Sequence, residues 1–202
     1  MSARWFVPVV MVLVIATTTK CAAGVIGNPS FENDSAWTVS TLGGEYSAYY
    51  GTSWASDQTR SFVFQRGTGT VYYGNYARIS QENVDLTGVT KFIFDCQDTG
   101  IDLVPLQFII DDTNLVGSWQ NNGHPGGQGS SWGHTAETLG IEIPLTTSFV
   151  GLHKLTIQMW NPLTHYPADP KIYRIDNLRT DPVPEPTTLT LLALSACAAI
   201  VG

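Results

Sequence analysis

The chain has few cysteines, few basic residues and no long apolar run outside its two ends. Cys21 and Cys197 lie within those apolar ends, so the central part keeps Cys96 alone and no internal disulfide can form there. A domain without a cross-link must take its stability from its core or from a bound ion. Cys96 lies in an apolar run typical of a strand, and we expect it to pack as a small apolar residue.

Basic side chains are outnumbered, with 10 Lys and Arg against 17 Asp and Glu and a net charge of −7. An acidic chain without a basic stripe repels polyanions, so nucleic acid is excluded as a partner. Catalytic signatures such as Gly-x-Ser-x-Gly, a Walker loop or His-Glu-x-x-His are also missing. Asp111 and Asp112 are adjacent, and neighbours on a strand point to opposite faces, so we expect a turn there and not a catalytic pair. The sequence predicts a protein that is not an enzyme.

The N-terminus carries a basic residue, an apolar run and then small residues. Arg4 precedes the run 5–16, and Cys21-Ala22-Ala23-Gly24 follows it. This order is typical of a secretory signal peptide, which we place at residues 1–24. The sequence therefore predicts export.

The C-terminus combines rigid prolines with an apolar tail. Val183-Pro184-Glu185-Pro186 cannot lie inside a helix, so an apolar helix must begin after Pro186. Residues 187–202 carry no charged side chain and would span about 24 Å as a helix, slightly less than a bilayer core of about 30 Å. We expect residues 181–202 to form a separate segment that inserts in a membrane.

This tail resembles the PEP-CTERM sorting signal of bacteria, in which Pro-Glu-Pro precedes a transmembrane helix and a basic cluster. The motif residues are Val183, Pro184, Glu185 and Pro186, and the usual Arg-rich end is missing. The resemblance implies an exosortase as partner, contact with the membrane through the C-terminal helix before processing, and a final place in the cell envelope, at the cell surface or in the extracellular matrix. An ordinary C-terminal anchor is the alternative.

Residues 25–180 are predicted to form one all-β domain. Short runs rich in β-branched and aromatic residues recur, several alternate apolar with polar side chains, and turns rich in Gly, Asn and Asp separate them. The expected strands are 36–40, 61–65, 76–80, 91–95, 106–111, 154–160 and 171–176. Many short strands favour an antiparallel β-sandwich. Trp37 and Trp160 lie within strand patterns, so both are expected in the core.

The order of short motifs resembles galactose-binding-like jelly rolls and carbohydrate-binding modules. The motifs are Gly27-Asn28-Pro29-Ser30-Phe31-Glu32-Asn33, Val84-Asp85-Leu86-Thr87-Gly88-Val89-Thr90 and Tyr173-Arg174-Ile175-Asp176-Asn177-Leu178. The resemblance implies a two-sheet sandwich whose first and last strands are neighbours.

The same resemblance implies a structural calcium ion where the two ends of the domain meet. Glu32 and Asp176 match its ligand positions. Calcium takes six to eight oxygen ligands, and two carboxylates from opposite ends of the domain would hold those ends together. The alternative is that both carboxylates face solvent or make turn hydrogen bonds.

A Gly- and Asn-rich stretch, Gly117 to His134, is predicted to be a long surface loop. It offers indole rings for stacking on sugars and amides for their hydroxyl groups. Our candidate ligand-binding residues are Trp119, Gln120, Asn121 and Trp132. The alternative is that each Trp folds back and caps the edge of the sandwich.

These observations predict an exported, noncatalytic surface or matrix protein that associates with extracellular polysaccharide. One alternative is a purely structural envelope protein without a glycan site. Another is a polysaccharide-active hydrolase.

Overall fold

The computed structural model describes residues 26–100, 104–120, 135–161, 166–168 and 170–181, all within one compact unit, Ala22–Val183. This part of the chain forms twelve β-strands and no helix. The strands are β1 (Thr38–Leu42), β2 (Tyr46–Gly51), β3 (Ser61–Arg66), β4 (Gly69–Val71), β5 (Tyr76–Asp85), β6 (Lys91–Thr99), β7 (Leu106–Ile110), β8 (Asn114–Trp119), β9 (Thr135–Pro144), β10 (Leu152–Trp160), β11 (Tyr166–Ala168) and β12 (Lys171–Thr180). The all-β prediction is confirmed for these residues.

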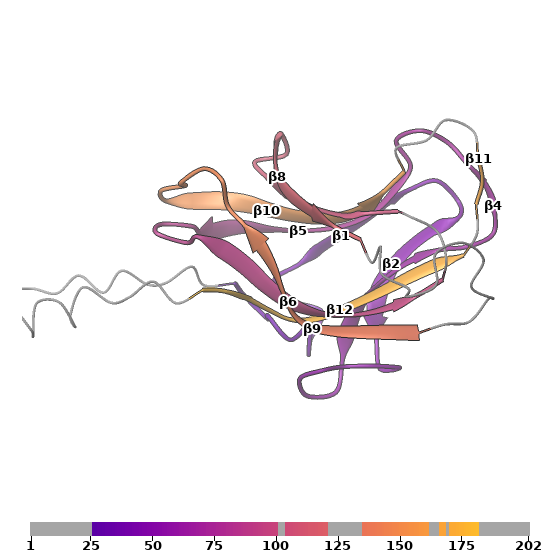
Figure 1. The fold of residues 1–202 in the computed structure, drawn as a ribbon, viewed down its shortest axis with the longest axis horizontal. Coiled ribbons are helices and arrows are strands. Elements are labelled where there is room, and N and C mark those ends of the chain that lie inside the picture. Colours follow the sequence, from indigo (N-terminus) through magenta and orange to yellow (C-terminus); the bar gives the residue numbers. More distant parts are fainter. Residues whose placement is uncertain (1–25, 101–103, 121–134, 162–165, 169, 182–202) are drawn as a thin grey trace, which may run out of the picture. The chain divides into compact units, whose positions relative to one another are not determined.

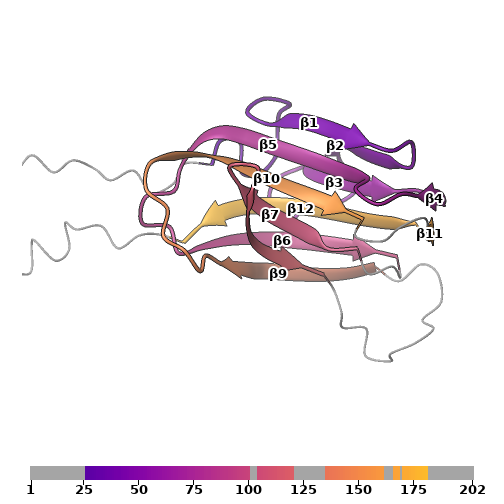
Figure 2. The ribbon, with the colours of Figure 1, turned by 90° about the horizontal axis from the view of Figure 1, so that it is seen from above.

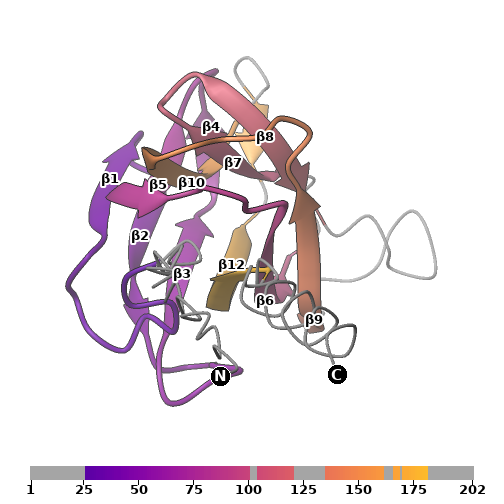
Figure 3. The ribbon, with the colours of Figure 1, turned by 90° about the vertical axis from the view of Figure 1, so that its left-hand side faces the viewer.

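Ten of the strands form two five-stranded antiparallel sheets that face each other (Figures 1 and 2). Sheet A has the order β1-β5-β10-β7-β8, and sheet B has the order β2-β3-β12-β6-β9. A small third sheet pairs β4 with β11. Seen end-on in Figure 3, β1 lies beside β2 at one border of the sandwich and β8 beside β9 at the other. The predicted antiparallel β-sandwich is therefore present.

The core lies between the two sheets because alternate side chains of each strand point inward. In β7, Leu106, Phe108 and Ile110 are buried, while the residues between them are partly exposed. Phe108 stacks on Phe92 of sheet B, with ring centroids 5.9 Å apart. Cys96 is fully buried and unpaired, as predicted, and burial raises the pKa of its thiol well above the ordinary value.

The pairing of the chain ends differs from the expectation. β1 pairs with β5 in sheet A, whereas β12 lies between β3 and β6 in sheet B, so the first and last strands are not neighbours. The segment before β1 makes the contact instead: the amide of Leu178 donates to the carbonyl of Pro29 over 2.9 Å. The ends of the domain therefore meet through a loop segment and not through paired strands.

Both predicted sorting signals lie outside the described residues. These are the signal peptide at 1–24 and the segment 181–202, apart from Asp181 at its start; the Pro-Glu-Pro motif lies in the undescribed part. In the part of the chain that the structure describes, no helix has the length and apolar character needed to cross a membrane.

Candidate functional site

The predicted calcium ligand Glu32 lies in the segment before β1 and binds the loop of residues 52–60. Its carboxylate accepts hydrogen bonds from the amides of Thr59 at 2.9 Å and Arg60 at 2.8 Å, and from the Thr59 hydroxyl at 2.7 Å. The Thr59 hydroxyl is the main cause that lowers the pKa of Glu32, and the two amides add to it. Glu32 therefore holds the end of this loop as an ionised carboxylate.

Asp176, the second predicted ligand, is fully buried in β12 and binds the same loop. Its carboxylate accepts from the amides of Ser56 at 2.8 Å and Asp57 at 2.7 Å, and from its own neighbour Asn177 at 2.8 Å. Burial raises the pKa of Asp176 in spite of these donors. The structure thus brings the two predicted ligands to one loop, each satisfied by N–H groups.

Asp95 extends this arrangement, because it is the cross-strand partner of Asp176 in β6. The Ser56 hydroxyl donates to Asp95 over 2.7 Å, and the amide of Gly140 donates over 2.7 Å. Among the described residues no group of three or more His, Cys, Asp or Glu side chains is placed to share a metal ion. Calcium at Glu32 and Asp176 would therefore need carbonyl or amide oxygens for most of its ligands, and it stays a prediction.

The predicted sugar-binding loop is described only at its start. Residues 117–119 belong to β8 and not to a loop, while Asn121 and Trp132 lie outside the described residues. The ring of Trp119 packs against Phe94 at 6.0 Å and Tyr173 at 5.8 Å between ring centroids. Trp119 thus folds back on the core, which is the alternative that the sequence left open. Gln120 follows it and is partly exposed. The binding role of these four residues stays a prediction.

The outer face of sheet A carries a polar row that crosses all five strands. Its register places one residue of each strand side by side: Ser40, Arg78, Gln158, Gln107 and Ser118. Arg78 donates from Nε over 3.0 Å and from Nη2 over 2.7 Å to Oε1 of Gln158, and Gln158 donates from Nε2 over 2.8 Å to Oε1 of Gln107. Three planar polar groups are therefore fixed in one line.

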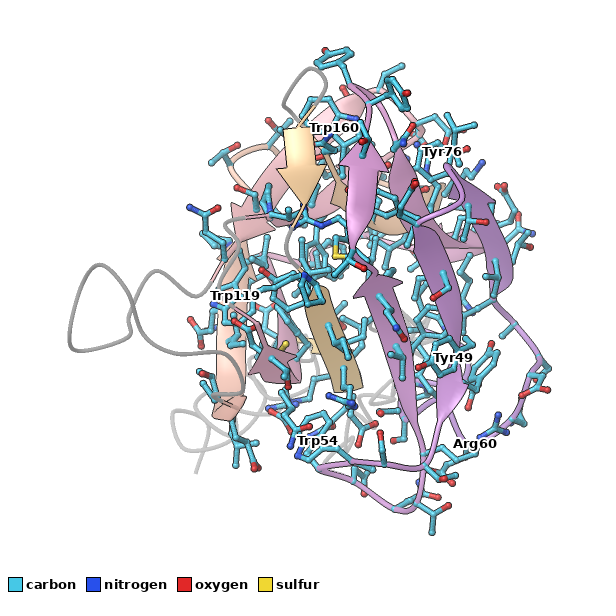
Figure 4. All side chains as sticks on the ribbon, turned by 90° about the vertical axis from the view of Figure 1, so that its right-hand side faces the viewer. Tyr49, Trp54, Arg60, Tyr76, Trp119 and Trp160 are labelled. Carbon is cyan, nitrogen blue, oxygen red and sulfur yellow. The ribbon has the colours of Figure 1, made fainter. Side chains whose placement is uncertain are left out.

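An aromatic row lies next to the polar row. Leu42, Tyr76 and Trp160 are cross-strand partners on the same outer face. The guanidinium of Arg78 lies 4.2 Å from the centre of the Tyr76 ring, and Tyr73 meets Trp160 edge-on at 5.5 Å between ring centroids. Figure 4 shows Trp160 and Tyr76 in its upper part, well separated from Trp119. Flat apolar rings thus border the line of amides.

Tyr73 is 62% exposed, yet its turn is firmly held. Asn161 directly follows β10 and is buried; its amide donates to the carbonyl of Asn75 over 3.0 Å, and its Nδ2 donates to the carbonyl of Tyr72 over 3.0 Å. The amide of Gly74 donates back to the carbonyl of Asn161 over 3.2 Å. The exposed aromatic ring is therefore presented on a preorganised turn.

The centre of this outer face is sheltered from solvent. Thr156 and Gln158 point away from the core, but they are only 1% and 4% exposed. The Thr156 hydroxyl makes no hydrogen bond within the described part of the chain. Such a buried, unpaired hydroxyl costs about 1–3 kcal/mol unless a water or a ligand reaches it.

The sequence did not reveal this face, and the prediction that Trp160 lies in the core is wrong. Trp160 alternates with the buried Met159, so it must point outward, whereas Trp37 is buried as expected. One feature of the sequence could have indicated this face. The outward positions of three strands carry long side chains with several hydrogen-bonding groups, namely Arg78, Gln107 and Gln158.

The outer face of sheet B has a different character. Arg174 donates to Ser53 over 2.8 Å and to Gln97 over 3.2 Å, but the exposed aromatic residue of that row, Tyr49, lies at the edge strand β2. Asp111 and Asp112 lie in the turn between β7 and β8, as predicted, and both have positive φ. These residues lie outside the polar and aromatic rows.

No protein-family model matches the chain, and no curated protein matches it. Among solved structures, the carbohydrate-binding module TmCBM61 in complex with β-1,4-galactotriose is 18% identical with a TM-score of 0.42, over 79% of this chain and 98% of that one. A structure of carbohydrate-binding modules from the β-sandwich superfamily is 13% identical with a TM-score of 0.45, over 79% and 63%. The enzymatically active domain of bacteriophage CBA120 tailspike protein 4 is 16% identical with a TM-score of 0.42, over 78% and 21%. The chain is thus similar to carbohydrate-binding modules and to part of a phage protein.

Proposed function

We propose that this protein is a noncatalytic glycan-binding protein whose binding site is the outer face of sheet A. The observation that carries the proposal is the polar row of Arg78, Gln158 and Gln107 beside the aromatic row of Tyr76 and Trp160. A pyranose ring offers apolar C–H faces and a rim of hydroxyl groups, so aromatic rings beside fixed amides match both parts. Because the amides already bind one another, little conformational entropy is lost on binding.

The absence of catalysis is supported by where the carboxylates lie. Glycoside hydrolysis uses two carboxyl groups about 5–9.5 Å apart that flank the bond to be cut. Neither described row contains a carboxylate, and Glu82 and Asp112, toward the other end of the face, both form ion pairs with Lys154. Asp95 and Asp176 are buried beside loop 52–60, on sheet B. The site is therefore suited to binding.

The proposal includes export and sorting. The signal peptide at 1–24 and the PEP-CTERM-like motif Val183, Pro184, Glu185 and Pro186 would deliver the domain to the cell envelope, with an exosortase-type enzyme as partner. The membrane would be contacted through the C-terminal helix until processing. Expression with and without residues 181–202, followed by fractionation of cells and medium, tests this part; identical distribution of both forms would contradict it.

Glycan binding is tested with the purified full chain on a polysaccharide panel in affinity electrophoresis. We expect Tyr76→Ala and Trp160→Ala each to weaken binding about tenfold, equivalent to about 1.4 kcal/mol. Tyr49→Ala is the matched control, since it removes an exposed aromatic ring from sheet B. Equal losses in all three variants, or no loss in the first two, would contradict the site.

The variant Trp132→Ala distinguishes a glycan site in the predicted loop from the site on the outer face of sheet A. Trp119→Ala is less informative, because its ring packs against Phe94 and Tyr173 and its removal affects stability. Loss of binding in Trp132→Ala, with full binding in Trp160→Ala, would move the site to the loop. If the protein binds no polysaccharide of the panel, the purely structural envelope role replaces our proposal.

A further inference from the structure

The guanidinium of Arg78 lies beside Gln158 on the proposed glycan-binding face, with part of its hydrogen-bonding capacity unused. A guanidinium has five N–H donors. One from Nε and one from Nη2 point at Gln158, and one face of the group lies over Tyr76. These contacts occupy one side of the fork. The Nη1 and Nη2 end remains, and this edge matches the two oxygens of a carboxylate or sulfate.

Four other cations of the described residues are paired with a carboxylate, whereas Arg174 on sheet B has neutral partners. Arg60, Lys91, Lys154 and Lys171 each have a carboxylate oxygen at 2.6–2.9 Å. Arg78 has no such partner within the described residues; its contacts are the neutral Gln158 and Tyr76. A positive charge without a counter-charge, set among aromatic and amide groups, is therefore available to a ligand.

The net negative charge of the chain does not cancel this local charge. The neighbours of Arg78 in its row, Ser40 and Gln158, are neutral. The next acidic residue outward along β5 is Glu82, four residues away, or about 13 Å at the rise of a strand. Screening at physiological salt acts over about 8 Å, so the field of Arg78 dominates at its own position.

We propose that the bound glycan is acidic, with its carboxylate or sulfate group held end-on by Arg78 and an adjacent sugar ring packed on the aromatic row. This inference rests on the proposed glycan-binding function and names its ligand class. A glutamine at position 78 could still donate one hydrogen bond to Gln158, but only a guanidinium offers a second, charged edge to an anion. The two bonds to Gln158 hold the guanidinium by one side and leave its Nη1 and Nη2 end for a ligand.

The experiment compares each polyuronate with its carboxyl-reduced neutral form. The probes are polygalacturonate, alginate and hyaluronate, their carboxyl-reduced counterparts, and a sulfated galactan with its desulfated form. Binding to the full chain is measured at about 0.05 and about 0.15 M salt, because salt screens the attraction between Arg78 and an anion and so weakens binding of the charged forms. We expect at least one charged form to bind about tenfold more tightly than its neutral counterpart. The uronate and sulfate arms identify which anion is bound.

The variants Arg78→Gln and Arg78→Lys assign the preference. Arg78→Gln keeps an amide beside Gln158 and should bring the ratio of charged to neutral binding close to one. Arg78→Lys keeps the charge without the planar fork and should retain only part of the ratio. Arg174→Gln is the matched control, because Arg174 lies on the outer face of sheet B with neutral partners, and its ratio should equal that of the unmodified chain. Thermal unfolding of each variant confirms that it is folded.

The outcomes separate the two proposals. No binding to any charged or neutral polymer overturns the glycan-binding function. Binding of neutral and charged forms with equal affinity keeps that function and overturns the acidic ligand. A charge preference that persists in Arg78→Gln, or that disappears in Arg174→Gln, overturns the assignment to Arg78.

Discussion

Glu32 and Asp176 both hold loop 52–60, but their surroundings move their pKa values in opposite directions. Glu32 is partly exposed, and hydrogen bonds, first that of the Thr59 hydroxyl, lower its pKa from the ordinary value of 4.5. Asp176 is buried, and the cost of desolvating its charge raises its pKa from 3.8. Relative to the unfolded chain, folding therefore makes Glu32 easier to ionise and Asp176 harder to ionise.

The Glu32 effect predicts a pH-dependent stability difference for Glu32→Gln. A lowered folded pKa adds stability that is present above the ordinary value of 4.5 and is lost as the pH falls through the folded pKa. We expect Glu32→Gln to unfold at lower urea concentration than the unmodified chain at pH 7, and the gap to shrink toward pH 3. The measurement is the urea midpoint at both pH values. A gap of the same size at pH 3 would show that Glu32 acts through shape and not through charge.

Glu137→Gln is the control for this experiment. Glu137 is an exposed carboxylate of the edge strand β9. Its removal should leave the urea midpoint unchanged within error at both pH values, because surface substitutions away from such contacts usually change stability by at most about 0.5 kcal/mol.

At the scale of elements, the sequence predicted the central strands and missed most of the edges. Six strands lie inside the sheets, and each overlaps a predicted strand: β3, β5, β6, β7, β10 and β12. The missed strands β2, β8 and β9 are all sheet edges, and the short β4 and β11 form the third sheet. An edge strand is half solvated, so its apolar alternation is weak; β8 even places Gly117 at an inward position. The apolar alternation that predicts a strand was therefore weak in these edge strands, because they are only partly buried.

Gly117 of β8 lies against Ile143 of β9 and gives the second prediction. A Cβ at this position would lie 2.5 Å from Cγ2 of Ile143, a branched side chain with little freedom to move. We expect Gly117→Ala to lower the free energy of unfolding by about 1–3 kcal/mol, as for overpacked cores. Gly44→Ala is the matched control, because no atom lies within 4 Å of its Cβ position. Equal denaturation midpoints for both variants would mean that the two strands separate at no cost.

At the scale of the whole molecule, the candidate face could not be read from the sequence. Its polar row combines one residue from each of five strands and runs from Ser40 on β1 to Ser118 on β8. These residues are neighbours only because of the strand order and register. A sequence shows which residues of one strand share a face, but it does not show which strand lies beside it. The predicted Trp-rich loop was a local feature, whereas the face is a product of the complete sandwich.

Loop 52–60 joins the two ends of the domain. It is bound by the segment before β1 through Glu32 and Ser30, whose hydroxyl donates to Asp57 over 2.6 Å. It is bound by the last strand through Asp176. Since no disulfide can do so within the domain, these contacts and the Leu178 to Pro29 hydrogen bond close the fold at this end. Any further ligand here would act on the stability of the whole domain.

Calcium at this junction is the third prediction. An ionised carboxylate has about four lone-pair sites. The hydrogen bonds of Glu32 leave one site on its Oε2, and those of Asp176 leave one on its Oδ1, so both keep a site for a cation. At a calcium concentration 100-fold above Kd, a native-state ligand adds about 2.7 kcal/mol. For a domain of this size we expect Tm to rise by about 5–10 °C between excess EDTA and millimolar calcium.

The variant Asp176→Ala decides whether this rise comes from the predicted site. It removes three amide contacts and lowers Tm by itself, so the decisive quantity is the difference between EDTA and calcium, which should vanish. Asp112→Ala, which removes an exposed carboxylate paired with Lys154, should keep the full difference. If the unmodified chain has the same Tm in EDTA and in calcium, the calcium prediction is wrong, and the hydrogen bonds of Glu32 and Asp176 close the domain without an ion.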